Sequence, residues 1–240
     1  MRMPDKRKPG VALRAVSYNI HSCVGRDNRK APERIVEVLK STGGTIIGLQ
    51  EVDSRIGGRS NLDQFRFLAE HSGMTSIAGP NVVEHRGEYG NILLTSWPVV
   101  ESRLLRLHVG RYEPRGAIIA TLLCEGIRIQ VVNTHLGLRL SERRKQVASL
   151  LEASSEFAGP TLFLGDFNVW MRRSMLLSRL GAPLAAVFNP STFPAGRPLI
   201  ALDRIWTRPP DAMRSVHVPR TALTSIASDH LPVIADIELS

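Results

Sequence analysis

Two short polar strings in the second half of the sequence each combine an acid with a hydrogen-bonding partner. Asp166 and Asn168 follow the apolar run 161–164, and Asp229 and His230 precede the apolar run 231–234. An apolar strand that ends in polar residues directs functional groups from a rigid sheet into a cleft. Carboxylate, amide and imidazole groups in such places can hold a cation, activate water and donate hydrogen bonds to an anionic substrate.

Three earlier segments show the same arrangement of an apolar run and a polar residue. Each residue alone has an ordinary structural explanation, such as a turn, a helix cap or a buried histidine. Their order along the chain and their joint chemistry carry the prediction of a site. The three residues are Asn19 at the end of the run 13–20, Glu51 after the run 45–49, and His135 after the run 127–134.

The acids and amides among these residues form a set of hard oxygen donors. Such a set suits Mg²⁺, with Mn²⁺ as the alternative, rather than Zn²⁺. Magnesium held by one or two carboxylates and water is usual where the substrate brings a phosphate group. The sequence therefore predicts a divalent-metal site for a phosphorylated substrate. The donors are Glu51, Asp166, Asp229, Asn19 and Asn168.

The neighbours Asp229 and His230 can divide the chemistry between them. Asp229 would meet the metal, and His230 would hydrogen-bond a phosphoryl oxygen. An imidazole in that role benefits from a second carboxylate that fixes its tautomer. Asp203 is the candidate because it begins another apolar run, residues 202–206. The sequence contains no glycine-rich phosphate loop, no His-Glu-x-x-His string and no nucleophile elbow.

The composition is that of a globular protein with an unusual charge. Of 240 residues, 43% are hydrophobic and 22% charged, and the net charge is +9. That charge predicts affinity for a polyanion, either nucleic acid, an anionic lipid surface or a phosphorylated small molecule. An arginine-rich composition that serves solubility is the alternative explanation. Cys23 and Cys124 are expected to be buried thiols, and without a signal peptide or a membrane-length apolar run the expected location is cytoplasmic.

Residues 1–10 are predicted to form a flexible basic tail, and residues 11–240 a single catalytic domain. Helices are expected at residues 32–39, 62–71 and 141–157, the last capped by Ser141. Closely spaced strands in the middle of the chain predict antiparallel pairing. The pattern is mixed α+β, with both faces of the sheets covered. Strands are expected at 13–20, 45–49, 90–95, 102–108, 117–123, 127–134, 161–164, 202–206 and 231–239.

Taken together, these motifs resemble the endonuclease/exonuclease/phosphatase superfamily in its small single-domain bacterial form. The resemblance runs from Ser17 to Ile237. Members of that superfamily include DNase I-like nucleases, bacterial sphingomyelinases, inositol polyphosphate 5-phosphatases and tyrosyl-DNA phosphodiesterases. The resemblance implies a four-layer α/β/β/α sandwich, in which two mixed β-sheets are flanked by helices.

The resemblance also implies a role for each motif residue. Glu51 would be the principal metal ligand, Asn19 would help to hold the metal and its water, and Asp229 would lie beside the metal. Asp166 would orient or deprotonate the attacking water. His135, Asn168 and His230 would contact the phosphate. Asp203 would orient His230.

Residues between the motifs are predicted less directly. Arg115 and Asn91 are candidates for substrate binding. Trp170 and the segment 192–194 are each expected to form one wall of the substrate cleft. A partner for His135 is expected at Glu88, Tyr89 or Asn91. The part played by Arg172 is left open.

The implied activity is hydrolysis of a phosphodiester by in-line attack of a water activated by Asp166. Two substrate classes remain open. A nuclease would use the net positive charge and the loop residues Arg55, Arg59, Arg86, Arg172 and Arg173. An enzyme for a phospholipid head group or a phosphorylated small molecule, similar to a sphingomyelinase or an inositol phosphatase, would use a closed pocket. A basic binding module without activity would need a broken set of motifs, and none of the expected residues is missing.

Overall fold

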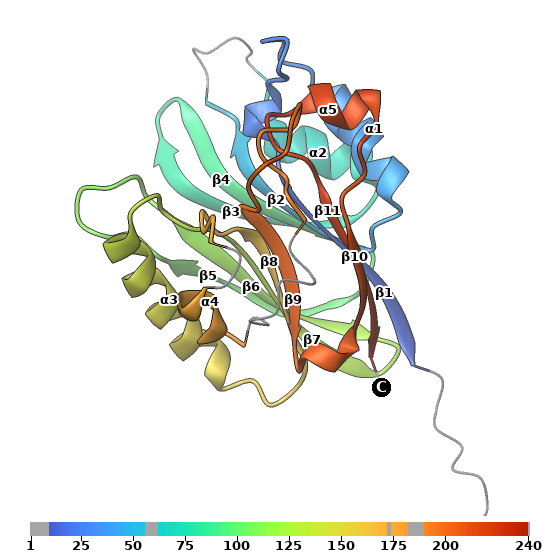
Figure 1. The fold of residues 1–240 in the computed structure, drawn as a ribbon, viewed down its shortest axis with the longest axis vertical. Helices are drawn as coiled ribbons and strands as arrows, with labels where there is room; N and C mark the ends of the chain where they lie inside the picture. The colour runs from blue at the N-terminus through green and yellow to red at the C-terminus, as the bar shows by residue number, and fades with distance from the viewer. Residues whose placement is uncertain (1–9, 56–61, 172–173, 182–189, 240) are drawn as a thin grey trace, which may run out of the picture.

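The computed structural model describes residues 10–55, 62–171, 174–181 and 190–239 of the chain. The basic tail predicted at the N-terminus therefore lies outside the described residues, apart from Gly10. Two mixed β-sheets pack face to face, and helices cover their outer faces (Figure 1). This architecture confirms the α/β/β/α sandwich that the motifs imply. No described helix is long and apolar enough to cross a membrane.

The first sheet has six strands in the order β10-β11-β1-β2-β4-β3. Strands β1 and β2 run parallel and are joined by helix α1, whereas the other neighbours in the sheet are antiparallel. Helices α1, α2 and α5 pack on the outer face of this sheet. The elements are β1 Val11–Asn19, α1 Pro32–Thr42, β2 Ile46–Asp53, α2 Gln64–Ser72, β3 Thr75–Glu84, β4 Gly87–Thr95, β10 Met213–His217, α5 Ala222–Ala227 and β11 Val233–Leu239.

The second sheet has five strands in the order β5-β6-β7-β8-β9. It repeats the plan of the first sheet, because its one parallel pair, β7 and β8, is joined by helix α3. Helices α3 and α4 pack on its outer face. The elements are β5 Val99–Arg106, β6 Gly116–Cys124, β7 Ile127–His135, α3 Leu140–Ser155, β8 Thr161–Asp166, α4 Met175–Ser178 and β9 Asp203–Arg208. The described residues also contain two short 3₁₀ turns, His21–Cys23 and Pro210–Ala212.

The sequence patterns located most of these elements. Helix α1 begins with Pro32 in its first turn and ends at Gly43, whose φ of 64° is the left-handed conformation that glycine adopts readily. The antiparallel pairing predicted for the middle strands is confirmed for β5, β6 and β7. Strand β3 was not predicted, because Gly79, Pro80 and Asn81 interrupt its pattern at a bulge in the pairing with β4.

Ser141 does not cap α3, contrary to expectation. The helix begins at Leu140, one residue earlier, and Arg139 is its N-cap. The physical reason is Glu142, whose carboxylate accepts hydrogen bonds from the Arg139 amide and from the Gln146 side chain. These contacts draw Glu142 inward and leave Ser141 exposed within the first turn.

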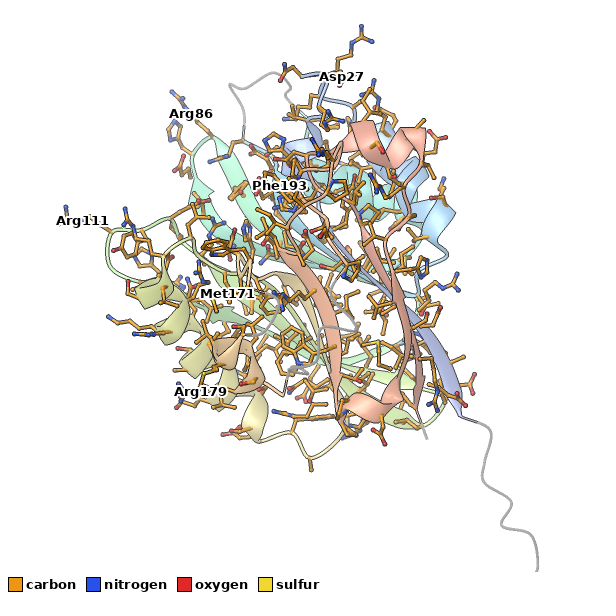
Figure 2. The ribbon with its side chains drawn as sticks, viewed as in Figure 1. Asp27, Arg86, Arg111, Met171, Arg179 and Phe193 are labelled. Carbon is orange, nitrogen blue, oxygen red and sulfur yellow. The ribbon has the colours of Figure 1, made fainter. Side chains whose placement is uncertain are left out.

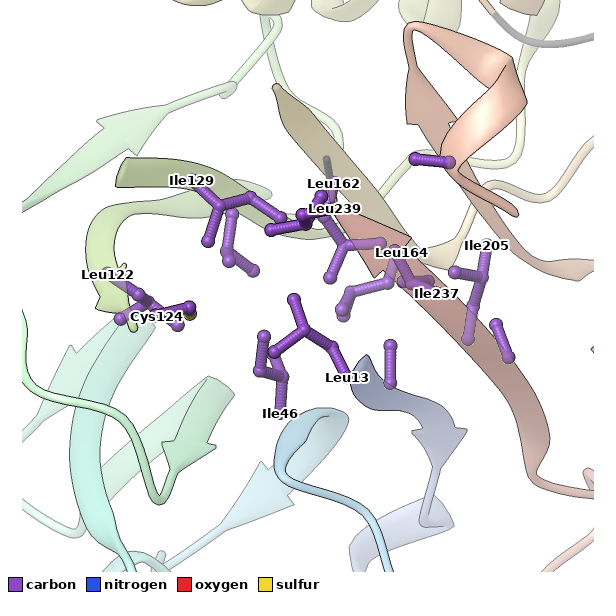
Figure 3. Close-up of a cluster of buried hydrophobic side chains, with 14 of the residues drawn as sticks. Leu13, Ile46, Leu122, Cys124, Ile129, Leu162, Leu164, Ile205, Ile237 and Leu239 are labelled. Atoms are coloured by element: carbon purple, nitrogen blue, oxygen red, sulfur yellow. The ribbon is translucent and has the colours of Figure 1, made fainter. Parts of the chain in front are cut away.

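A close-packed apolar core joins the two sheets (Figure 3). Leu13 and Ile46 of the first sheet meet Leu122 and Leu164 of the second in this cluster. The sheets approach closely at Gly48, where an added Cβ would lie 1.9 Å from Leu164 Cδ1. Both cysteines are buried free thiols, as expected, and Cys124 belongs to this core.

Candidate active site

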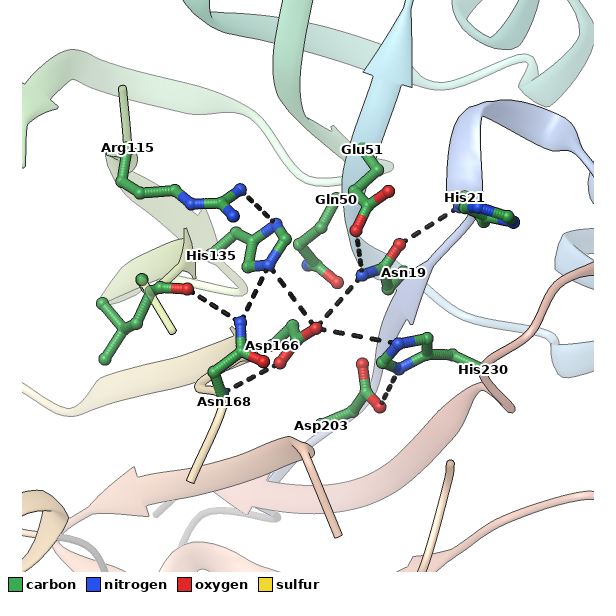
Figure 4. A network of polar contacts seen from close by, with 12 residues as sticks. Asn19, His21, Gln50, Glu51, Arg115, His135, Asp166, Asn168, Asp203 and His230 are labelled. Atoms are coloured by element: carbon green, nitrogen blue, oxygen red, sulfur yellow. Dashed lines mark hydrogen bonds and ion pairs between the residues drawn. The ribbon is translucent and has the colours of Figure 1, made fainter. Parts of the chain in front are cut away.

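The site lies where the parallel pairs of both sheets end. Asn19 closes β1 and pairs in register with Gln50 of β2, one residue before Glu51. His135 closes β7 and pairs with Asp166 at the end of β8. Asp166 in turn pairs with Asp203 at the start of the antiparallel strand β9. The sheets thus bring segments far apart in sequence to one edge, where their side chains form a continuous polar network (Figure 4).

Asn19 joins the two carboxylates at the centre of this network. Its Nδ2 donates to Glu51 Oε1 at 2.8 Å and to Asp166 Oδ2 at 3.1 Å. Its Oδ1 accepts a hydrogen bond from the His21 backbone amide at 3.1 Å. A single buried amide therefore holds two carboxylates from different sheets close together, as the sequence predicted for Glu51 and the 166–168 segment.

Glu51 lies on a bulge in β2. The register between β2 and β4 shifts between Leu49 and Val52, and Glu51 adopts a φ of 58°. A non-glycine residue in the left-handed region is strained by about 1–3 kcal/mol, and such strain gathers at functional sites. The bulge turns the Glu51 side chain toward Asn19 and away from regular strand geometry.

His135 is buried between a cation and an acid. Its Nδ1 lies 3.1 Å from Arg115 Nη1, and its Nε2 lies 3.6 Å from Asp166 Oδ2. Burial, with the charges of Arg115 and His230, lowers the pKa of His135 to about 3, and Asp166 opposes the shift. His135 is therefore a neutral imidazole at physiological pH.

His230 has the opposite environment. Its Nδ1 lies 2.7 Å from Asp203 Oδ2, and its Nε2 lies 3.9 Å from Asp166 Oδ2. Burial lowers the pKa of His230, but the carboxylates of Asp203, Asp166 and Asp229 together outweigh burial and raise it to about 10. Thr192 donates to the same Asp203 oxygen at 2.5 Å, and Phe193 packs on the imidazole with ring centroids 4.9 Å apart.

Asp166 is held from several sides. The Asn168 backbone amide donates to its Oδ1 at 2.9 Å, while its Oδ2 faces Asn19 and both histidines. Asn168 itself adopts a φ of 51° and donates from Nδ2 to the Leu136 carbonyl at 2.9 Å. Asp166 is 2% exposed, so its carboxylate has a fixed position in the network.

Asp229 lies at the rim of the network. Ser228 anchors the segment by donating from Oγ to the Asn19 carbonyl at 2.8 Å, and the same Oγ lies 3.3 Å from Asp229 Oδ1. The Asp229 carboxylate is half-exposed and lies 3.8 Å from His21 Nδ1. Asp229 therefore joins the site through Ser228 and His21, at the solvent side of Asn19.

Three predicted substrate residues lie in different surroundings. Arg115 is buried in the network beside His135. Asn91 is buried between the sheets, where its Nδ2 donates to the Gly116 carbonyl at 3.2 Å. Trp170 is 69% exposed, beyond Asn168 on the loop after β8. Within the described part of the chain, no hydrogen bond joins Asn91 or Trp170 to the central network, so their role as substrate contacts stays a prediction.

Sequence reasoning missed the partners that orient the motif residues. The partner of His135 is Arg115, not the expected Glu88, Tyr89 or Asn91. His21 was assigned no role, and Thr192 was expected in a wall of the cleft rather than as the hydrogen-bond partner of Asp203. The Tyr89 hydroxyl lies close to Arg115, and burial raises its pKa. Arg172 lies outside the described residues.

The donor atoms fit a hard divalent cation. Glu51 and Asp229 are half-exposed carboxylates, and no described Arg or Lys side chain forms an ion pair with either of them. A second group, Asp166, Asp203 and His230, has donor atoms within 4.8 Å of one another. Its Asp203 and His230 are already engaged with each other at 2.7 Å, which leaves the Glu51 side as the better oxygen site.

Comparisons with known proteins show what this chain and its fold are similar to. The protein YbhP of Escherichia coli strain K12 is 28% identical over 256 residues, which cover 99% of this chain and 100% of YbhP. An endonuclease/exonuclease/phosphatase from Bacteroides vulgatus superposes with a TM-score of 0.77 at 21% identity, over 95% of this chain and 99% of that one. The structure of Danio rerio TDP2 complexed with a single-strand DNA product superposes with a TM-score of 0.69 at 17% identity, over 94% of this chain and 98% of that one.

These structural matches share the fold, and the sequence itself carries the family assignment. The model of the endonuclease/exonuclease/phosphatase family matches residues 16–230, a span that contains every motif residue from Asn19 to His230. The chain thus belongs to the endonuclease/exonuclease/phosphatase family, whose members are hydrolases of phosphoesters.

Proposed function

We propose that the protein is a divalent-metal-dependent phosphodiesterase in which Asp166 activates the attacking water. The observation that carries this proposal is a convergence: Glu51 and Asp166 meet at the amide of Asn19, and His135 and His230 both face Asp166 Oδ2. Acids alone could serve many reactions. Two acids, a neutral imidazole and a cationic imidazole around one point match the needs of an in-line displacement at phosphorus.

Asp166 is the group placed to accept the proton of the water. Its Oδ1 accepts a hydrogen bond from the Asn168 amide, and its Oδ2 faces the interior of the site. Because Asn19 and the two histidines all approach Oδ2, the carboxylate cannot rotate away. A fixed carboxylate oxygen of this kind orients a water for attack and takes its proton as the new bond to phosphorus forms.

The two histidines supply different hydrogen bonds to the phosphate. His230, held protonated by Asp203, would offer a cationic donor from Nε2 to an oxygen that gains charge in the transition state. His135 would offer a neutral donor from the opposite side. Asn168, which borders both Asp166 and His135, would bind a further phosphate oxygen.

Glu51, Asn19 and Asp229 would hold the cation, Mg²⁺ or alternatively Mn²⁺. When bound there, the ion supplies charge neutralisation for the non-bridging phosphate oxygens. The strained bulge at Glu51 supports this role, because it directs a half-exposed carboxylate into the site at a cost in backbone energy.

Nucleic acid is the substrate class that we propose first. The net charge of +9 favours a polyanion, and Arg86 and Arg111 project to the same side of the molecule (Figure 2). The structural neighbour TDP2 was solved with a single-strand DNA product. A phospholipid head group or a phosphorylated small molecule is the alternative. Arg59, Arg172 and Arg173, which also support nucleic acid, lie outside the described residues.

A substrate panel with matched variants tests the proposal. Plasmid DNA, RNA, sphingomyelin, inositol phosphates and bis-p-nitrophenyl phosphate would be assayed with Mg²⁺, Mn²⁺ or EDTA. We expect EDTA to abolish turnover and Glu51→Gln to lower it by at least ~100-fold. Glu37→Gln, on the exposed face of α1, is the control and should match the wild-type rate. Full metal-dependent turnover by Glu51→Gln would contradict the assignment of this ligand.

A further inference from the structure

Arg115 is a buried cation at the inner wall of the site. It is 6% exposed, and its guanidinium is held by the Glu113 carboxylate, with Nη2 3.0 Å from Oε2. The other terminal nitrogen, Nη1, points at His135 Nδ1 from 3.1 Å (Figure 4). The sequence suggested that Arg115 binds substrate, yet this nitrogen is committed to an imidazole.

A guanidinium can only donate hydrogen bonds, so this contact constrains the proton of His135. If Arg115 donates to Nδ1, then Nδ1 must carry a lone pair and cannot carry a proton. A neutral imidazole has one N–H, which must then be at Nε2. Protonation of both nitrogens would place an N–H against the guanidinium, which agrees with the lowered pKa of His135.

Two contacts act on Nε2 in opposite directions. Nε2 faces Asp166 Oδ2 at 3.6 Å and Asn168 Nδ2 at 3.1 Å. The amide nitrogen of Asn168 has two protons: one is donated to the Leu136 carbonyl at 2.9 Å, and the other favours a lone pair at Nε2 and so opposes this choice. A proton at Nε2 meets a carboxylate, whereas a proton at Nδ1 meets only a cation. The charged contact is the stronger constraint.

We propose that Arg115 is a positioning residue that fixes His135 as the Nε2–H tautomer and thereby aims a neutral donor at Asp166 and the substrate. A metal-ligating or catalytic histidine more often has a carboxylate or carbonyl behind it, which fixes the proton on the buried nitrogen. Here a cation stands in that place, and the proton is on the nitrogen that faces the reaction. The inference about the proton rests on the geometry alone, and its catalytic meaning rests on the proposed phosphodiesterase activity.

The tautomer can be measured without any substrate. In protein labelled with ¹⁵N in its histidine rings, two-dimensional correlation spectra distinguish the protonated from the unprotonated nitrogen, and His135→Asn identifies the resonances of His135. We expect the Nε2–H form, without conversion to imidazolium, from about pH 5 to about pH 9. Observation of Nδ1–H, or of imidazolium at neutral pH, would overturn the proposal.

Variants of Arg115 separate a positioning role from a substrate contact. Arg115→Met should populate the Nδ1–H form and let His135 titrate at higher pH, while lowering kcat about 10- to 100-fold with a smaller change in KM. Arg115→Lys, which keeps a donor, should recover part of the Nε2–H population. Arg128→Met, at an exposed position of the same strand as His135, is the control.

The outcomes distinguish this inference from the proposed function. If the tautomer in Arg115→Met is unchanged, Arg115 is not what positions His135, whatever the activity. If the wild-type enzyme turns over none of the panel substrates but shows the Nε2–H tautomer that Arg115→Met loses, the positioning role stands and the assigned reaction fails.

Discussion

The two histidines of the site have neighbours of opposite charge. Asp203 Oδ2 lies 2.7 Å from His230 Nδ1, and Arg115 Nη1 lies 3.1 Å from His135 Nδ1. The pKa of His230 rises to about 10 and that of His135 falls to about 3. Pairs of titratable groups whose environments separate their pKa values are a feature of acid–base sites. Burial lowers the pKa of both histidines, and nearby carboxylates, led by Asp203, reverse that effect only at His230.

The first prediction at the residue scale concerns pH. His230 should remain protonated until the pH approaches about 10, so its hydrogen bond to substrate should be lost only above that range. In Asp203→Asn the pKa of His230 falls toward its ordinary value, because burial then acts without the compensating carboxylate. We expect the alkaline limb of kcat against pH to move to lower pH. An unchanged alkaline limb would contradict the role of Asp203.

The same pair links pH to stability. His230 has a higher pKa in the folded state than in the unfolded chain, so the pair contributes its full stability below about pH 6.5 and loses it as the pH rises toward about 10. The urea concentration at the midpoint of unfolding of the wild type should therefore fall as the pH rises through this range. In Asp203→Asn the midpoint should depend less on pH over the same range.

At the scale of elements, the site is built from one parallel pair in each sheet. The ends of β1 and β2 carry Asn19 and Glu51, and the ends of β7 and β8 carry His135 and Asp166. Gly165 makes the second pairing possible. Its φ is 150°, and an added Cβ would lie 2.0 Å from the Thr134 carbonyl oxygen. The strand that delivers Asp166 therefore requires glycine one residue before it.

This requirement predicts a large effect from one methyl group. Gly165→Ala should lower the free energy of unfolding by about 2 kcal/mol or more, because the conformation is nearly restricted to glycine and the methyl group meets backbone. It should also displace Asp166 and reduce turnover. Gly110→Ala is the matched control: its φ is 59° with nothing within 4 Å of an added Cβ, so a cost of about 1 kcal/mol is expected. Equal losses in urea unfolding would refute the steric argument.

At the scale of the whole molecule, the two sheets are locked together beneath the site. Asn133 of β7 donates to the Ile92 carbonyl at 2.9 Å, and Gln50 of β2 donates to Asn133 Oδ1 at 2.8 Å. These bonds cross the apolar interface directly behind Glu51 and His135. They fix the two halves of the network in one frame, because a directional hydrogen bond between buried groups defines their relative position more specifically than an apolar contact does.

The net charge of the molecule gives the last prediction. If the substrate is nucleic acid, binding of a single-stranded oligonucleotide should weaken steeply with salt, and the slope of log K against log salt falls by about 0.7 for each phosphate contact removed. Arg86→Gln with Arg111→Gln should flatten that slope. Arg66→Gln, on the helix α2 that covers the outer face of the first sheet, should leave it unchanged. Binding that is independent of salt would favour the small-molecule or lipid alternative.

The sequence by itself predicted the chemistry of the site and located much of the framework. Glu51, Asp166 and His230 could be recognised because each stands beside an apolar run, and a run of that kind is a local property of the chain. The positions of α1 and of the buried strands followed for the same reason. The family that the sequence motifs indicated is confirmed, because the model of the endonuclease/exonuclease/phosphatase family matches residues 16–230.

Only the tertiary structure decided which residues meet and in what protonation state. The pairing of His135 with Asp166, and of Asp166 with Asp203, depends on the register of strands joined by long connections. Arg115 became the partner of His135 because the β6–β7 pairing and the burial of both side chains brought them together. Register and burial are set by packing across the whole sheet, and the pKa of a histidine follows its neighbours in space rather than in sequence.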